Sequence, residues 1–143
     1  MTFQITKAQS REEIDAVFDG DAPHWHPDDF WNTRMQEQRV FIAKDGDNSI
    51  GLLCYTTWWG NTPFLELIHI QDNHQRKGIG KSLLKEAAKE IQSKKFKTLV
   101  SSCEQDNDDS HKFHQALNFE KLNGLALSHG EEQFYSIKLE KLV

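Results

Sequence analysis

The clearest pattern in the chain is helical and runs from about Gly80 to Lys94, where apolar residues recur every three or four positions. Its apolar side consists of Leu83, Leu84, Ala87, Ala88 and Ile91. Before it, Phe64 to Ile70 is apolar at both alternating sets of positions, which predicts a central strand covered on both faces. Glu66 is the one charged residue in that strand.

Shorter patterns fill the rest of the chain. Ser10 and Glu13 have the spacing of a capping box, and apolar residues at helical spacing follow them. Further helices are expected from Pro27 and over 107–117, the last with Phe113, Ala116 and Leu117 facing inward. Strands are expected at 3–7, 40–43, 50–57, 98–101, 119–127 and 133–139. The order β-α-α-β-β-β-α-β-α-β-β predicts a single mixed α/β domain over residues 1–143.

Composition narrows the possible partners. Seventeen basic residues against 22 acidic ones give a net charge of -5, which argues against nucleic-acid binding. No stretch approaches the ~20 apolar residues of a membrane span, and the start lacks the apolar middle of a signal peptide. A cytoplasmic protein without membrane contact is therefore expected, with Cys54 and Cys103 reduced and internal. The two strands near the carboxyl end are a candidate surface for a homodimer.

Two glycines and several cations stand between the central strand and the long helix, in Gln75-Arg76-Lys77-Gly78-Ile79-Gly80. Glycine lets the backbone approach a ligand closely, and a helix amino end favours an anion, so a phosphate is the expected ligand. The nucleoside triphosphate loop is excluded because it needs a glycine at position 75, which is glutamine. The dinucleotide fingerprint is excluded because its third glycine would stand at position 83, which is leucine. A plain glycine turn with surface lysines is the remaining alternative.

This hexapeptide resembles the Q/R-x-x-G-x-G/A turn of the GNAT acetyltransferases. Residues 107–119 are similar to that family's N-x-x-[AS]-x-x-[FL]-[YH]-x-x-x-[GN]-F segment. Asn118 stands where the family usually has glycine, and His114 where tyrosine is commonest. The resemblance implies a mixed, mostly antiparallel sheet in which two parallel central strands splay apart.

The resemblance also implies acetyl-CoA as co-substrate, with pantetheine along the end of the central strand and pyrophosphate on the glycine turn. The cofactor-binding residues it implies are Ile68, His69, Ile70, Gln75, Arg76, Lys77, Gly78, Ile79, Gly80, Lys81, Ser82, Asn107, Ser110 and Phe113. No metal is predicted, because His24-Trp25-His26 has no nearby cysteines or clustered carboxylates.

The predicted reaction is direct transfer of an acetyl group to a primary amine of a small molecule or protein. Glu66 is the candidate base, since a carboxylate within a central strand needs a partner or a task; pairing with a cation is the alternative. His114 is the candidate acid for the thiolate, or else a hydrogen-bond donor to sulfur or substrate. Trp31, Trp58 and Trp59 are candidates for the acceptor pocket, and core packing is equally expected for each. A non-catalytic acyl-CoA-binding or regulatory module is the competing hypothesis.

Overall fold

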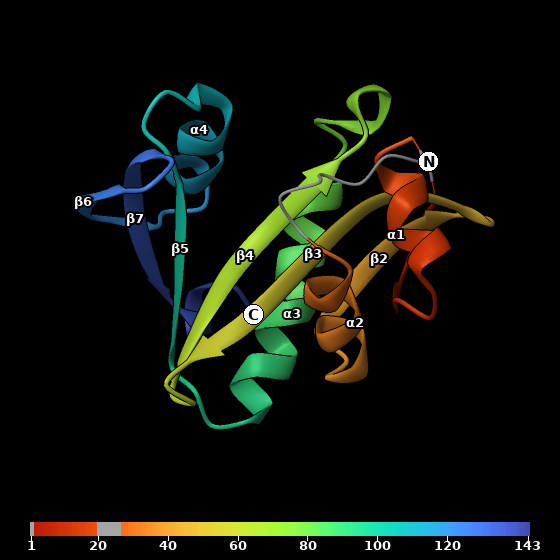
Figure 1. Ribbon diagram of the computed structural model, residues 1–143, viewed down its shortest axis with the longest axis horizontal. Helices are drawn as coiled ribbons and strands as arrows, with labels where there is room; N and C mark the ends of the chain where they lie inside the picture. The colour runs from red at the N-terminus through yellow and green to blue at the C-terminus, as the bar shows by residue number, and fades with distance from the viewer. Residues whose placement is uncertain (1, 20–26) are drawn as a thin grey trace. The chain divides into compact units, whose positions relative to one another are not determined.

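The computed structural model describes residues 2–19 and 27–143, so the segment containing His24 and His26 lies outside the described residues. The predicted order of helices and strands is confirmed (Figure 1). The elements are β1 (Gln4–Lys7), α1 (Arg11–Val17), α2 (Asp28–Gln36), β2 (Val40–Asp45), β3 (Asn48–Trp58), β4 (Thr62–Ile70), the 3-10 turn η1 (Asp72–His74), α3 (Ile79–Ser93), β5 (Thr98–Glu104), α4 (Asp108–Ala116), β6 (Glu120–Leu127), β7 (Gly130–Lys138) and the 3-10 turn η2 (Leu139–Lys141).

The strands form one seven-stranded sheet in the order β1-β2-β3-β4-β5-β7-β6. The pairs β1/β2, β2/β3, β5/β7 and β6/β7 are antiparallel. The β4/β5 pair is parallel, with Phe64 opposite Val100 and Leu65 opposite Ser101. A mostly antiparallel sheet with one parallel pair at its centre agrees with the predicted fold class.

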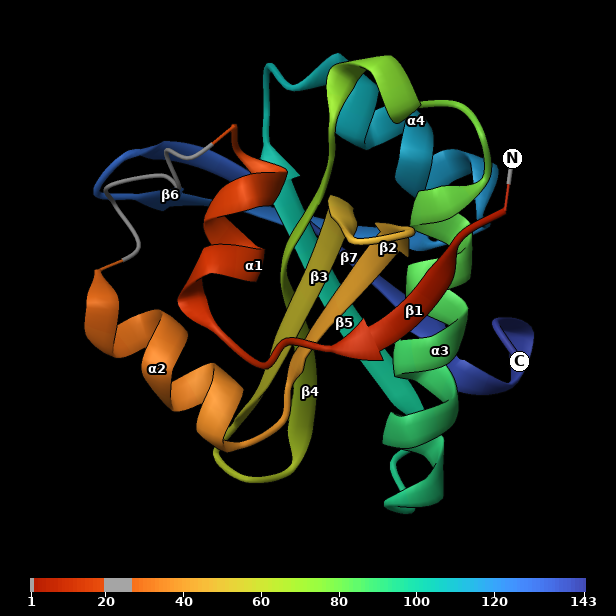
Figure 2. The same ribbon diagram turned by 90° about the vertical axis from the view of Figure 1, so that its right-hand side faces the viewer.

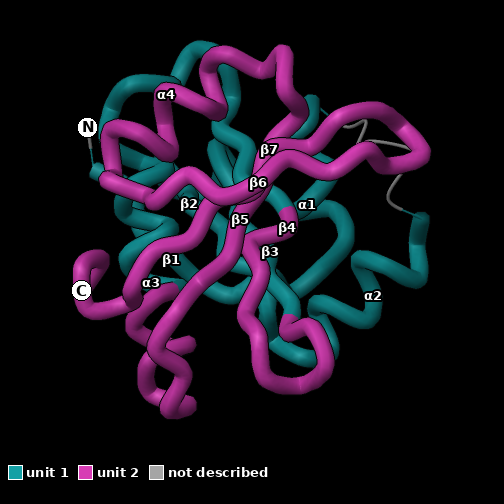
Figure 3. Tube along the Cα trace, turned by 90° about the vertical axis from the view of Figure 1, so that its left-hand side faces the viewer, with its two compact units in different colours: residues 1–56, 67–87 teal, residues 57–66, 88–143 magenta. Residues whose placement is uncertain are grey.

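The chain divides into two compact units (Figure 3). Unit 1 consists of Met1–Thr56 and Leu67–Ala87, and unit 2 consists of Thr57–Glu66 and Ala88–Val143. Strand β4 and helix α3 each contribute residues to both units.

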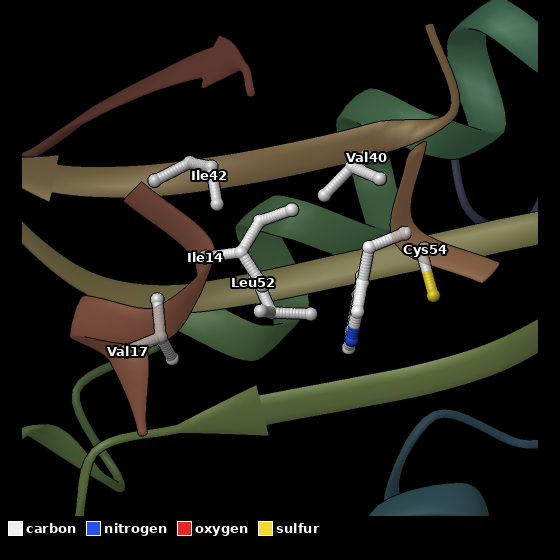
Figure 4. Packing of buried hydrophobic residues seen from close by; sticks show 7 residues of the cluster. Ile14, Val17, Val40, Ile42, Leu52 and Cys54 are labelled. Atoms are coloured by element: carbon white, nitrogen blue, oxygen red, sulfur yellow. The ribbon is translucent and has the colours of Figure 1, made fainter. Parts of the chain in front are cut away.

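The core of unit 1 lies where α1 and α2 pack against one face of β2 and β3 (Figure 2). Its fully buried members are Ile14, Val17, Trp31, Val40, Ile42, Leu52 and Cys54 (Figure 4). The predicted cap forms at the start of α1, where the Ser10 hydroxyl accepts a hydrogen bond from the Glu13 N–H at 3.3 Å. The Glu13 carboxylate in turn accepts one from the Gln9 N–H at 2.7 Å.

The opposite face of β3 brings the start of α3 close to the sheet at Gly51. A Cβ atom at Gly51 would lie 2.7 Å from Cδ1 of Ile70 and 3.4 Å from Cγ2 of Ile79. Its cross-strand neighbour on β2 is the small residue Ala43. The two small residues therefore make room for the junction between β4 and α3, which carries the glycine turn.

Unit 2 packs α4 against β5 and β7. The inward face of α4 differs from the prediction, because His114 is buried while Ala116 is exposed and Phe113 and Leu117 are half-buried. The periodicity of apolar residues missed a histidine whose ring nitrogens are both hydrogen-bonded, which makes its burial tolerable.

Strand β6 is the exposed edge of the sheet, with solvent reaching every one of its residues. Cys54 and Cys103 are buried, as the sequence predicted, and neither forms a disulfide bond with another described residue. Among the described residues, no helix is long and apolar enough to cross a membrane.

Candidate functional site

In unit 1, the glycine turn joins β4 to α3 through left-handed backbone at Arg76 and Gly78, whose φ angles are 63° and 81°. The Gln75 side chain ties the turn back to the strand, because its Nε2 donates to the Ile70 carbonyl at 3.1 Å. The first bond of the helix runs from the Ser82 N–H to the Gly78 carbonyl at 3.1 Å.

The main-chain N–H groups of Ile79, Gly80 and Lys81 precede that first bond, so helix geometry leaves them without intrahelical acceptors. Ile79 is buried and anchors the turn, while the side chains of Arg76, Lys77 and Lys81 are exposed. Free amides at the positive end of a 15-residue helix, together with three cations, make a site for an anion such as a pyrophosphate.

The end of β4 departs from the prediction of a strand covered on both faces. Glu66 and the four residues after it are only half-buried, although most of them are apolar. On one face Leu67 packs against the core of unit 1, and His69 stacks on Phe18 with ring centroids 4.6 Å apart. Burial lowers the pKa of His69, partly offset by Asp72 and Asp19. Because of this stacking, the His69 side chain is held against α1.

The three tryptophans predicted for the acceptor pocket have different environments. Trp31 is fully buried in the core of unit 1, so its indole is a packing group without an open face. In unit 2, Trp58 stacks on Phe64 with centroids 4.3 Å apart, and Phe134 lies 6.2 Å from it. Trp59 is 86% exposed at the tip of the turn between β3 and β4.

His114 forms a buried bridge between α4 and β5. The Ser101 hydroxyl donates to Nε2 of His114 at 2.7 Å, and the His114 Nδ1–H donates to the Ser110 carbonyl at 2.7 Å. The ring also stacks on Tyr135, with centroids 4.4 Å apart and planes at 11°. Burial lowers the pKa of His114, so the neutral imidazole that this bonding pattern requires is the favoured form.

A second imidazole extends this network. The His111 Nε2–H donates to the Gln105 carbonyl at 2.9 Å, and its Nδ1 accepts from the Tyr135 hydroxyl at 2.7 Å. Burial raises the pKa of both Tyr135 and Cys103, which lies beside His111. The sequence analysis did not predict that Ser101 and Tyr135 take part in this network. The only signal in the sequence is that His111 and His114 are three residues apart on one helix.

Of the cofactor residues predicted for this segment, Asn107 and Ser110 lie at the amino end of α4, and Phe113 lies further along the helix. The Asn107 side chain caps the helix, since its Oδ1 accepts from the Ser110 N–H at 3.1 Å. Ser110 is half-buried, and Phe113 meets the His114 ring edge to face at 5.8 Å. The cap leaves the amide nitrogen of Asn107 as the group available to a ligand.

Three possible metal ligands converge in unit 2. Donor atoms of Glu104, His129 and Glu132 lie within 4.8 Å of one another. Nε2 of His129 and Oε1 of Glu132 are 2.9 Å apart, so these two side chains satisfy each other by a hydrogen bond. The absence of a metal requirement stays a prediction.

The class of protein is an acyltransferase, as the comparison with protein families shows. The model of the Acetyltransferase (GNAT) family matches residues 4–119, and the chain belongs to this family. No match is found among curated protein sequences.

Solved structures with the same fold share little sequence with the chain. A GNAT-family acetyltransferase from Bacillus cereus ATCC 10987 superposes with a TM-score of 0.77 at 22% identity, covering 96% of this chain and 98% of its own. An N-acetyltransferase from Staphylococcus aureus Mu50 superposes with a TM-score of 0.76 at 21% identity, covering 97% of this chain and 99% of its own. A Salmonella typhimurium protein solved with its cofactor acetyl-CoA superposes with a TM-score of 0.72 at 16% identity, covering 96% of this chain and 94% of its own.

Proposed function

We propose that the chain transfers an acetyl group from acetyl-CoA directly to a primary amine of a small molecule or protein, with residues 1–143 acting as one domain. The observation that carries the proposal is the turn before α3, where three free amides lie beside three exposed cations. The family match over 4–119 includes residues of both units and supports the single-domain proposal. The acetyl-CoA in the Salmonella structure supports the choice of cofactor.

Acetyl-CoA would meet the chain along a half-buried strand end. Ile68 and Ile70 are apolar but only half-buried, so a pantetheine arm lying on β4 would remove apolar surface from water. The diphosphate would accept hydrogen bonds from the amides of Ile79, Gly80 and Lys81. The contact of Asn107 with the cofactor stays a prediction.

Glu66 is the proposed base. An alkylammonium with a pKa near 10.4 is only about one-thousandth neutral around pH 7, so attack on the thioester needs a proton acceptor, direct or through water. Glu66 is a half-buried carboxylate on β4, two residues before Ile68. An ion pair with a cation is the structural alternative for this residue.

The role of His114 follows from its two hydrogen bonds. Its lowered pKa disfavours the imidazolium that would protonate a thiolate. We therefore propose that His114 is a positioning residue, which holds α4 and its cap Asn107 on β5 through Ser101. Donation of a proton to the leaving thiolate is the competing prediction. For His114→Gln, positioning predicts a raised KM for acetyl-CoA with an unchanged pH profile of kcat, whereas the acid role predicts a lost limb in that profile.

Two measurements test the proposed function. Acetyl-CoA should raise the thermal midpoint of the full chain, because a ligand of the native state stabilises it. A panel of primary amines with acetyl-CoA should then release free thiol. If neither coenzyme A nor acetyl-CoA shifts the midpoint, the cofactor assignment is wrong.

A non-catalytic acyl-CoA-binding module is separated from an enzyme by Glu66→Gln. An enzyme should keep its acetyl-CoA affinity and lose most of its thiol release, whereas a binding module would show no amine-dependent release in either form. Glu12→Gln, at an exposed position on α1, is the control for a lost charge. The cytoplasmic location and the homodimer stay predictions.

A further inference from the structure

A cavity of about 260 Å³ lies in unit 1, apart from the residues proposed for catalysis. Its walls include Asp45 at the end of β2, Asp47 in the turn that follows, Ser49 from β3, Gln71 just before η1, and His74 at the end of η1. The function proposed above makes no use of this cavity.

Backbone bonds hold the walls of the cavity in place. The Gln71 N–H donates to the Ile50 carbonyl at 2.9 Å, and the Gln71 Nε2 donates to the Ala16 carbonyl at 3.0 Å. The His74 N–H donates to the Gln71 carbonyl at 2.9 Å. These bonds join α1, β3 and η1, so the cavity is formed in advance of any ligand, and the side-chain oxygen of Gln71 is left as an acceptor.

Two polar groups at the cavity lack protein partners. Ser49 is 6% exposed, and within the described residues its hydroxyl has no hydrogen-bond partner. The Nδ1 atom of His74 is buried and also has no partner there. Buried polar groups in native structures are nearly always hydrogen-bonded, so the buried Nδ1 atom of His74 and the unpaired hydroxyl of Ser49 leave hydrogen-bonding capacity for a ligand of the cavity.

The charge of the lining residues defines the ligand. Asp45 and Asp47 supply two carboxylates, and no lysine or arginine lines the cavity among the residues that the structure describes. In the described part of the chain, only Glu104, His129 and Glu132 bring three donor atoms for a metal within 4.8 Å of one another, and they lie in unit 2. Asp45, Asp47 and His74 therefore do not converge on one metal ion.

We propose that this cavity binds a small organic ammonium ion. Its N–H groups would donate to the carboxylates of Asp45 and Asp47, to the Ser49 hydroxyl and to the Gln71 side-chain oxygen. Carboxylates form the strongest hydrogen bonds with such cations. The volume is just below the roughly 300 Å³ at which drug-sized pockets begin, so the ligand is a short alkylammonium or diammonium ion.

The test is an NMR titration of the full chain without acetyl-CoA, with 1,4-diaminobutane and butylammonium as probes. We expect saturable shifts of the amide signals of Ser49, Gln71 and His74. Asp45→Asn with Asp47→Asn should weaken binding about tenfold or more, because hydrogen bonds to charged groups are lost. Glu12→Gln removes an exposed charge on α1 outside the cavity and should leave the affinity unchanged.

Control ligands and a further variant distinguish an ammonium site from a metal site and from nonspecific binding. Tetramethylammonium, which has no N–H donor, and Mg²⁺ should produce no saturable shift at these three residues. Ser49→Ala should weaken binding without lowering the stability of the chain, because the hydroxyl that it removes has no protein partner. Saturation by Mg²⁺, or shifts that survive in the Asp45/Asp47 double variant, would overturn the proposal.

The acceptor of the proposed reaction is also an amine, so the two sites must be distinguished. Glu66→Gln should bind the probes at the cavity as the unaltered chain does, even though it has lost most of its acetyl transfer. If the probes shift only signals around Glu66, the cavity assignment fails while the enzymatic proposal stands.

Discussion

Trp59 adopts a conformation that its side chain disfavours. Trp59 and Gly60 have φ angles of 54° and 71°, and the Asn61 N–H closes the turn on the Trp58 carbonyl at 3.0 Å. Turns with two left-handed residues favour Asn-Gly, because a Cβ atom crowds the following carbonyl oxygen. A strained, exposed tryptophan gains little from packing, which supports its proposed contact with the acceptor.

Trp59→Asn should therefore raise the free energy of unfolding by about 1 kcal/mol, measured by urea denaturation. If Trp59 contacts the acceptor, the same change should raise the KM for the amine. The control is Asn118→Gly, at a φ of 64° where asparagine already fits, and its stability should change by only a few tenths of a kcal/mol. A loss of stability in Trp59→Asn would show that contacts of the indole outweigh the strain.

Position 78 favours glycine because of its backbone conformation and not because of crowding by neighbours. A Cβ atom there would meet nothing within 4 Å, but the φ of 81° is strained for any other residue. Gly78→Ala should cost about 1 kcal/mol of stability and weaken coenzyme A binding, because the turn that presents the amides would relax.

Gly46→Ala is the matched control for Gly78→Ala. Gly46 also has a positive φ, 62°, with open space around it, but it lies in the turn between β2 and β3. Equal stability losses with weaker coenzyme A binding only at Gly78 would support the phosphate role, as read by calorimetry. Equal affinities in the two variants would contradict it.

At the scale of elements, the approach of α3 to β3 depends on a glycine. Gly51→Val should cost on the order of 1–3 kcal/mol, because the added atoms would overlap Ile70 and press on Ile79. Gly51→Ala should cost less, since Cδ1 of Ile70 is the end of a side chain that can rotate. Denaturant midpoints of both variants measure this, and a Val variant as stable as the original would exclude the close contact.

Helix α4 shows where sequence patterns and packing diverge. Its position and length followed from the spacing of apolar residues. Its inward face did not, because periodicity treats histidine as polar and cannot anticipate hydrogen-bond partners on β5 and the preceding turn of α4. The same holds for Ser101 on β5 and Tyr135 on β7, whose contacts with α4 are not visible in the pattern of any single element.

The whole molecule should become less stable in mild acid. The pKa values of His69 and His114 are lowered from 6.5 mainly by burial, so the unfolded chain binds more protons than the folded one. Their stabilising contribution is complete above about pH 6.5 and falls as the pH drops from there toward the folded-state values. Urea midpoints at pH 7.5 and 5.5 should differ accordingly.

His114→Gln should reduce this pH dependence, because one of the two buried imidazoles is then missing. Gln115→Ala, at an exposed position of α4, is the control and should leave the dependence nearly unchanged. A pH dependence that is identical in all three proteins would mean that His114 does not contribute to it.

The sequence alone determined the element order, the mixed α/β class and the position of the glycine turn, because these depend on local periodicity and on glycines at particular positions. It also led to Glu66, Asn107 and the cationic residues before α3. These features are encoded in short stretches, so they can be read without knowing which strands become neighbours.

Only the tertiary structure decided which polar groups are buried and what they bond. It placed Trp31 in the core, exposed Trp59, and gave His114 two hydrogen-bond partners, one of them on β5. It also assembled the cavity of Asp45, Ser49 and His74 from separate segments. Burial and hydrogen bonding depend on contacts between elements, which a local sequence pattern does not contain. They determine the lowered pKa of His114, used in the proposed function, and the polar groups without protein partners at the cavity, used in the further inference.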